Sequence, residues 1–197
     1  MEIVHYPHPI LRHKTKPVMK INDELREIAE EMKVLMTQSD GVGLAAIQVG
    51  LPLRLYVMKY IENIAEDDID QAETLVFINP AISRKKGMEI SEEGCLSFPK
   101  LFMPVRRATE IQLTGYDLNG EKQSLRLQGF PARVAQHECD HLNGIVFTDR
   151  VEQSLQESVE DALYDFELAF RKNQQEGKIA DDATLMEEIE ELEKKWC

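Results

Sequence analysis

The residues with the clearest chemistry are His137 and His141, which lie within residues 136–144 and bracket Glu138. On a helix, positions i and i+4 lie one turn apart on the same face, so both imidazoles can reach one metal ion. Glu138 starts beside the first of them, where its carboxylate can touch a water at that metal. Two histidines that hold a metal and a glutamate that moves protons are the working groups of a metallohydrolase.

A third ligand must come from elsewhere in the chain, because a catalytic site of this kind has three protein ligands and one open position. The sequence contains three cysteines. Cys139 follows His137 by two residues and should point away from the metal face. Cys197 ends the sequence and is expected to fray. Cys95, which lies between Gly- and Pro-marked breaks, is therefore the best candidate for a thiolate ligand.

Length and composition are typical of one globular domain. The 197 residues are 43% hydrophobic, which is enough to bury a sizeable core. We expect no membrane span and no signal peptide, because no apolar run is long enough and the first residues lack the required pattern. An odd number of cysteines without a disulfide framework indicates a reducing, cytoplasmic compartment. The net charge of −13 argues against general binding to nucleic acid.

The acidic charge is concentrated in two places. Residues 151–197 hold 14 acidic and 5 basic residues, and residues 62–73 hold six acidic and no basic residues. Such runs are typical of solvated surface. We expect residues 1–171 to form the catalytic domain and residues 172–197 to form an acidic, helical C-terminal extension. The apolar residues of that extension follow helical spacing: Leu185, Ile189, Leu192 and Trp196.

Periodicity predicts the helices that surround these residues. Apolar residues at helical spacing predict a helix over residues 25–36, with Asn22 or Asp23 as its N-cap and Gly41 past its end. Residues 130–142 should form the helix that carries the two histidines, and Gly144 should stop it. A further amphipathic helix should run through residues 155–170.

Strands are expected over residues 53–59, 75–78, 109–118 and 121–127. The last two flank Asn119 and Gly120, which is a strong hairpin signal. Helices and strands do not alternate regularly, so an α+β fold is favoured. We expect mixed or antiparallel strands around a central helix that carries the His-Glu-x-x-His motif, with a C-terminal helix.

Three segments in a fixed order identify a family. They are Gly41-Val42-Gly43-Leu44-Ala45-Ala46-Ile47-Gln48, Glu93-Gly94-Cys95-Leu96-Ser97 and residues 136–144. Together they closely resemble the three signature motifs of the peptide deformylases, and the resemblance covers residues 1 to about 170. It implies an enzyme that removes the formyl group from N-formylmethionine on new bacterial or organellar polypeptides. A bacterial cytoplasmic protein is therefore expected.

The resemblance also implies a cofactor and partners. The metal would be one divalent ion, usually Fe(II), and Zn, Ni or Co can occupy such a site. The partners would be N-formylmethionyl nascent peptides, with transient ribosome association. Some deformylases dock on the ribosome through a basic C-terminal helix. The tail of this chain is acidic, so that docking mode is not carried over. Residues 60–74 resemble an insertion that forms either a flap or an acidic loop.

Roles follow from the resemblance residue by residue. Cys95, His137 and His141 would hold the metal, and Glu138 would act as general base and acid. The side-chain amide of Gln48 and the backbone N–H of Leu96 would form the oxyanion site. Gly43 would pair with the substrate backbone.

Residues that flank the first and third motifs are candidates for an apolar pocket that takes the methionine side chain: Val42, Phe130 and Val134. Val134 precedes His137 by three residues and so shares its side of a helix. Arg133 is one residue away and is expected to face the rim. Arg107 could pair with Glu93 to hold the loop of Cys95, and an ordinary surface pair is the alternative.

Two other functions fit parts of the pattern. A metallopeptidase that cuts internal peptide bonds would share the His-Glu-x-x-His motif but usually takes Glu or His as its third ligand. A structural metal module would close its site with four protein ligands, usually rich in cysteine. Cys95 speaks against the first, and a count of three ligands plus Glu138 speaks against the second.

Overall fold

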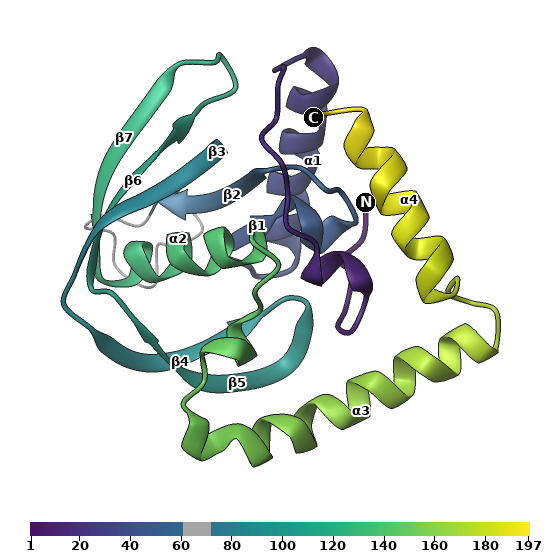
Figure 1. Ribbon diagram of the computed structural model, residues 1–197. Coiled ribbons are helices and arrows are strands. Elements are labelled where there is room, and N and C mark those ends of the chain that lie inside the picture. The colour runs from purple at the N-terminus through teal and green to yellow at the C-terminus, as the bar shows by residue number, and fades with distance from the viewer. Residues whose placement is uncertain (61–71) are drawn as a thin grey trace.

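The computed structural model describes residues 1–60 and 72–197, and its strands surround one central helix (Figure 1). Five antiparallel strands form one sheet in the order β1-β2-β3-β6-β7, and β4 and β5 form a second, two-stranded sheet. The predicted α+β fold is confirmed. The strands are β1 (Gly43–Ala45), β2 (Leu55–Tyr60), β3 (Glu73–Lys86), β4 (Glu89–Cys95), β5 (Phe98–Arg107), β6 (Glu110–Tyr116) and β7 (Lys122–Gln128).

Four α-helices and several short 3-10 helices complete the part of the chain that the structure describes. They are η1 (Pro9–Arg12), α1 (Asp23–Gln38), η2 (Ala46–Val49), α2 (Gly129–His141), η4 (Phe147–Arg150), η5 (Gln153–Leu155), α3 (Gln156–Gln175) and α4 (Asp182–Lys194). None of the described helices is long and apolar enough to cross a membrane. The flap or acidic loop expected at residues 60–74 falls largely outside the described residues.

Helix α1 confirms the helix predicted from periodicity. The side chain of Asn22 accepts a hydrogen bond from the backbone N–H of Leu25 at 2.9 Å, which satisfies one of the free donors of the first turn. The helix buries Leu25, Ala29, Met32 and Met36 against the five-stranded sheet. It thereby covers the side of that sheet away from α2.

The hairpin of β6 and β7 also confirms the sequence prediction. The Asp117 carboxylate accepts hydrogen bonds from the backbone N–H groups of Asn119 and Glu121, both at 2.8 Å. Gly120 has a φ of +79°, a conformation that favours glycine. The turn therefore fixes the register in which these strands pair.

Strand β3 is longer than predicted, and the hairpin of β4 and β5 was not predicted. The strand was predicted to end at residue 78, just before Asn79 and Pro80. In the structure, Asn79 has a φ of +52° and the pairing shifts register there, so a bulge lets the strand continue to Lys86. β5 was not predicted because it contains Pro99 and Pro104, and proline usually argues against a strand. Proline is tolerated on an edge strand, where its missing N–H need not take part in the hydrogen bonds of the sheet.

Helix α2 is the core helix of the molecule. Ten of its thirteen residues are buried, including both histidines and Glu138. The helix is enclosed because both sheets pack around it (Figure 1). Gly144, with a φ of +70°, follows its end as predicted.

The N-terminal segment, residues 1–19, ties the motifs together through backbone hydrogen bonds. Val4 N donates to Gln48 O at 2.8 Å and Tyr6 N donates to Ser97 O at 3.0 Å. Further along, Thr15 N donates to Leu142 O at 3.1 Å, at the end of α2. One extended stretch thus contacts the neighbourhood of all three motifs.

The end of α4 and the residues after it pack against this N-terminal segment. Trp196 is only 6% exposed, and its carbonyl accepts a hydrogen bond from Met19 N. The buried Glu193 side chain bonds to His13 Nε2 at 2.8 Å and to Lys16 Nζ at 2.6 Å. Cys197, which is exposed, donates its backbone N–H to Glu193 O at 3.1 Å.

We predict that Trp196→Ala destabilises the protein by about 3 kcal/mol, because it removes a buried aromatic side chain and leaves a cavity. Leu192→Ala on the same stretch is the matched control. Leu192 is 38% exposed, so its loss should cost about 1 kcal/mol or less. Urea unfolding of both variants measures the difference. Equal stability losses would contradict the packing seen for Trp196.

Candidate active site

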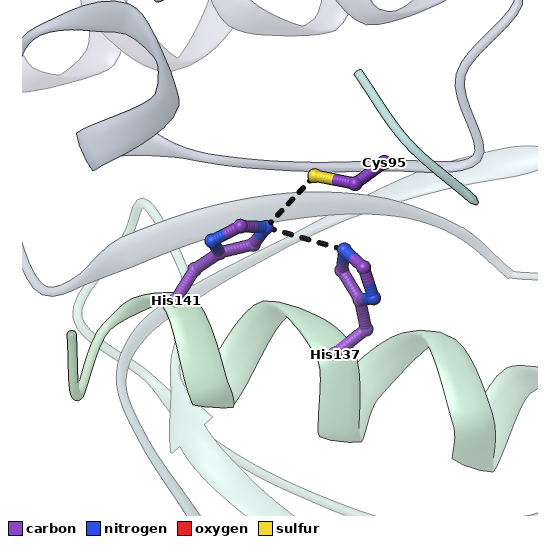
Figure 2. A group of neighbouring side chains, drawn as sticks. All are labelled: Cys95, His137 and His141. Atoms are coloured by element: carbon purple, nitrogen blue, oxygen red, sulfur yellow. Dashed lines mark hydrogen bonds between the residues drawn. The ribbon is translucent and has the colours of Figure 1, made fainter. Parts of the chain in front are cut away.

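Cys95, His137 and His141 lie together although they come from different parts of the chain. The two histidines rise from neighbouring turns of α2, and Cys95 ends β4 above them (Figure 2). Their ligand atoms all lie within 4.8 Å of one another. Cys95 Sγ is 3.3 Å from His141 Nε2, which is 3.2 Å from His137 Nε2. Cys139 is buried outside this cluster.

These spacings fit a metal ion. Ligand atoms held at about 2.0–2.3 Å by a tetrahedral ion are roughly 3.3–3.6 Å apart, close to the two distances observed. A sulfur and two imidazole nitrogens suit a transition metal rather than Mg²⁺ or Ca²⁺. Three protein ligands leave a position free, which is the arrangement of a catalytic centre rather than a structural one.

Glu93 orients the first histidine. Its Oε2 is 3.1 Å from His137 Nδ1, so Nδ1 can donate to the carboxylate while Nε2 faces the other ligands. Arg107 binds both carboxylate oxygens, at 2.9 and 3.0 Å. Burial alone would raise the pKa of Glu93, but the hydrogen bonds from His137 and Arg107 outweigh it and lower the pKa to about 2. Glu93 therefore remains an anion beside the cluster.

Arg133 does not face the rim as expected. It is 7% exposed, and its guanidinium donates to Glu93 Oε1 at 2.7 Å and to Val105 O at 2.9 Å. Arg107 also pairs with Asp140 on α2. The pair of Arg107 and Glu93 is thus a buried one, since each side chain is only 5% exposed. These ion pairs hold β4, β5 and α2 in one arrangement around the cluster.

Gln48 lies beside Cys95, on η2. Its Oε1 accepts a hydrogen bond from Ala45 N at 2.8 Å, which turns Nε2 toward the second motif. There Nε2 is 3.4 Å from both Cys95 Sγ and Ser97 Oγ. The side chain is almost fully buried, so it presents an N–H₂ donor next to the cluster of Cys95, His137 and His141. Leu96 follows Cys95, and both line one hollow together with Gln48.

Glu138 is buried next to Gly43. Burial raises the pKa of Glu138 to about 7, and its Oε2 has no hydrogen-bond partner among the described residues. A Cβ atom at Gly43 would overlap the Glu138 carboxylate and approach Val134 within 3.0 Å. Only glycine therefore lets β1 pass this close to the carboxylate.

A hollow of about 590 Å³ opens beside the cluster. Its lining includes every residue proposed for the substrate pocket, together with Cys95, His137 and Glu138: Val42, Gly43, Phe130 and Val134. Phe130 is 48% exposed and Phe102 is 63% exposed, so two aromatic rings lie toward its mouth. The structure thus places the candidate site residues in one region.

Sequence reasoning did not predict the contacts of two residues of this region, Arg133 and Ser97. Arg133 is a charged residue between Ala132 and Val134, near the start of α2, and a charge among apolar neighbours is the signal that could have revealed a buried partner. Ser97, which is fully buried, gave no signal, because its contact with Gln48 depends on two segments meeting in space.

Comparison with known proteins decides the family. The family model for polypeptide deformylase matches residues 1–157. The peptide deformylase of Rhodopirellula baltica is 42% identical over 193 residues, which is 98% of this chain and 94% of that protein. The chain belongs to the polypeptide deformylase family.

Solved structures of peptide deformylases have the same fold as this chain. The enzyme from Thermus thermophilus superposes with a TM-score of 0.77 at 37% identity, over 87% of this chain and 97% of that one. The enzyme from Synechococcus elongatus, solved with actinonin, gives 0.74 at 40% identity, over 84% and 86%. The chain is therefore a metal-dependent hydrolase that removes the N-formyl group from nascent polypeptides. This function displaces the internal metallopeptidase and the structural metal module.

Proposed function

We propose that Cys95, His137 and His141 hold the metal of this deformylase, that Glu138 moves the protons, and that Gln48 and Leu96 N–H stabilise the oxyanion. The observation that carries the proposal is the convergence of the three ligand atoms beside the buried Glu138 and Gln48. When bound, the metal supplies Lewis acidity and lowers the pKa of water so that hydroxide is available near neutral pH.

The chain's own residues then divide the hydrolysis between them. Glu138 accepts a proton from the attacking water as its oxygen bonds to the formyl carbon. Gln48 Nε2 and the N–H of Leu96 donate to the formyl oxygen as it gains negative charge. Glu138 returns the proton to the amine nitrogen when the carbon–nitrogen bond breaks. Formate and a free N-terminal amine leave.

The edge position of β1 supports a role for Gly43 in substrate binding. β1 is the first strand of its sheet and pairs on one side with β2. A peptide in extended conformation can add to such an edge through backbone hydrogen bonds. Gly43 lies on this strand and lines the hollow, where a bound chain would run past Glu138.

We further propose Fe(II) as the native metal, with Zn, Ni or Co as substitutes, because a thiolate ligand favours these ions over harder ones. The test is formate release from formyl-Met-Ala-Ser, measured anaerobically on purified protein whose metal content is determined. Release that follows bound iron and stops on chelation supports the proposal. An active protein that purifies without a transition metal would contradict it.

The apolar hollow gives a prediction for specificity. Val42, Phe130 and Val134 offer no partner to a charged side chain, and an unpaired carboxylate there is costly. Formyl-Met and formyl-norleucine peptides should therefore exceed formyl-Asp peptides in kcat/KM by roughly 100-fold or more. Steady-state kinetics on matched tripeptides measures the ratio. Equal values for formyl-Met and formyl-Asp would refute the apolar pocket.

We propose that residues 1–171 supply the catalytic chemistry and that residues 172–197 serve stability. All proposed ligands lie upstream of the extension, but residue 171 falls inside α3, so the natural end for a shortened chain is Gln175. We predict that this shortened chain, with matched metal content, keeps kcat within 100-fold while its Tm falls. A larger loss of kcat would mean that α4 shapes the active site.

The substrate also suggests where the enzyme works. Formylated chains emerge from ribosomes, so we propose that it acts in the bacterial cytoplasm and meets the ribosome transiently. The acidic α4 gives no basic surface for docking there, since the helix carries six acidic residues against a single lysine. Co-sedimentation with ribosomes at low and physiological salt tests the encounter, and stable binding through α4 would contradict this view.

A further inference from the structure

A second hollow lies on a different face of α2 from the metal ligands. It measures about 530 Å³. Gln136, Cys139, Asp140 and Asn143 line it, at the spacing of one helical stripe. The neighbouring stripe, with Val134, His137 and Glu138, lines the active-site hollow instead. The catalytic chemistry makes no use of the second hollow.

The lining of this hollow is strongly basic although the protein is acidic. It includes Arg54, Lys85, Arg106, Arg107 and Arg150 but one acidic residue, Asp140. Two further acids outside the lining pair with these groups, Glu93 with Arg107 and Glu152 with Arg106. Five basic groups therefore face three acidic ones within a chain of net charge −13, so the excess is local.

Two of the cations lack an acidic partner among the described residues. Arg54 donates to neutral oxygens at 3.3–3.5 Å: Thr15 Oγ1, Leu142 O, Asn143 Oδ1 and Pro80 O. These distances exceed those of ordinary N–H···O bonds. Lys85 is exposed, and no described residue forms an ion pair with it. A half-buried guanidinium and a free ammonium thus line one hollow without a neutralising charge.

We propose that this hollow binds a phosphate group carried on a small organic molecule, a phosphomonoester. The excess of two positive charges matches a phosphate dianion better than a single carboxylate, and arginine forks suit phosphate oxygens. The volume exceeds that of bare phosphate, and Pro80, Ile82 and Ile145 supply an apolar wall for an organic body. Arg107 lies at the buried floor, while Lys85, Arg106 and Arg150 are exposed around it.

The test uses the full-length, metal-loaded enzyme and calorimetric titration with 5′-AMP. Lys85→Glu should weaken binding at least tenfold, and Arg106→Gln should weaken it severalfold. Lys122→Glu is the matched control, because Lys122 is also exposed but lies outside both hollows. It should change the Kd by less than twofold. Formate release should stay unchanged in all three variants, which shows that each one folds.

Parallel titrations with inorganic phosphate and with an oligoadenylate distinguish the source of the phosphate. Tighter binding of 5′-AMP than of either supports a small phosphomonoester. Tighter binding of the oligoadenylate, still weakened by Lys85→Glu, supports phosphate recognition at this site but assigns it to an RNA backbone. The proposal is overturned if 5′-AMP shows no saturable binding, or if Lys85→Glu and Lys122→Glu weaken its binding equally. It is also overturned if 5′-AMP binds Lys85→Glu as tightly as the unchanged enzyme and inhibits formate release, because the ligand would then occupy the active site.

Discussion

Glu138→Gln should reduce kcat for formyl-Met-Ala-Ser by roughly 10² to 10⁴ while the metal stays bound. The amide keeps the shape of the side chain but cannot accept a proton from water or return one to the leaving amine. Glu138 is beside His137 in the chain but is not among the three clustered ligand atoms. In this variant kcat should therefore fall while the metal content per protein stays unchanged.

The measurement is single-turnover formate release at matched metal loading, with metal counted per protein. Glu187→Gln is a suitable control, because Glu187 is an exposed residue on α4 far along the chain. It makes the same chemical change and should leave kcat unaltered. Near-normal turnover of fully loaded Glu138→Gln would end the assignment of Glu138 as the proton carrier.

Cys95→Ser should weaken metal binding or change metal preference, since a neutral hydroxyl replaces a thiolate. Loss of one of three ligands should cost activity in proportion to the metal lost, and we expect at least a 100-fold drop at limiting metal, about 2.7 kcal/mol. Competition with a chromogenic chelator gives the affinity directly. Circular dichroism checks that the variant is folded.

Cys139→Ser is the matched control for Cys95→Ser. Cys139 lies on α2 and Cys95 lies close to it, but Cys139 lines the second hollow and is buried outside the ligand cluster. Burial raises the pKa of Cys139 to about 12, so it stays a neutral thiol. A Cys139→Ser protein that loses its metal, beside a Cys95→Ser protein that keeps it, would show that the proposed ligand set is wrong.

The sequence predicted those helices and strands that are specified by residues close together in the chain. Asn22 and the apolar stripe after it specify α1, and Asn119 with Gly120 specifies the hairpin of β6 and β7. The β4–β5 hairpin could not be predicted, because Gly94 in β4 and the two prolines of β5 are residue types typical of loops. Its strands persist through pairing with each other and through the ion pairs of Glu93, which are contacts between distant segments.

Some residues of the candidate site could likewise be predicted from local spacing, and others could not. His137, Glu138 and His141 follow from helical spacing alone, and Cys95 follows from the need for a third ligand. The resemblance added Gln48 and Gly43, whose geometry no local pattern predicts. Arg133 was misplaced because one helical step suggested the rim. In fact its long side chain reaches Glu93, and two arginines share that buried carboxylate.

The contact between His13 and Glu193 also bears on how this protein is made. It joins residues 180 positions apart, and closing so long a loop is slow in folding. Residues 1–19 leave the ribosome well before α4, which follows every other described element in chain order. We therefore expect the N-terminal segment to wait, partly unpacked, until α4 has been synthesised. An enzyme that processes unfinished chains would then complete this part of its own fold only after α4 has emerged.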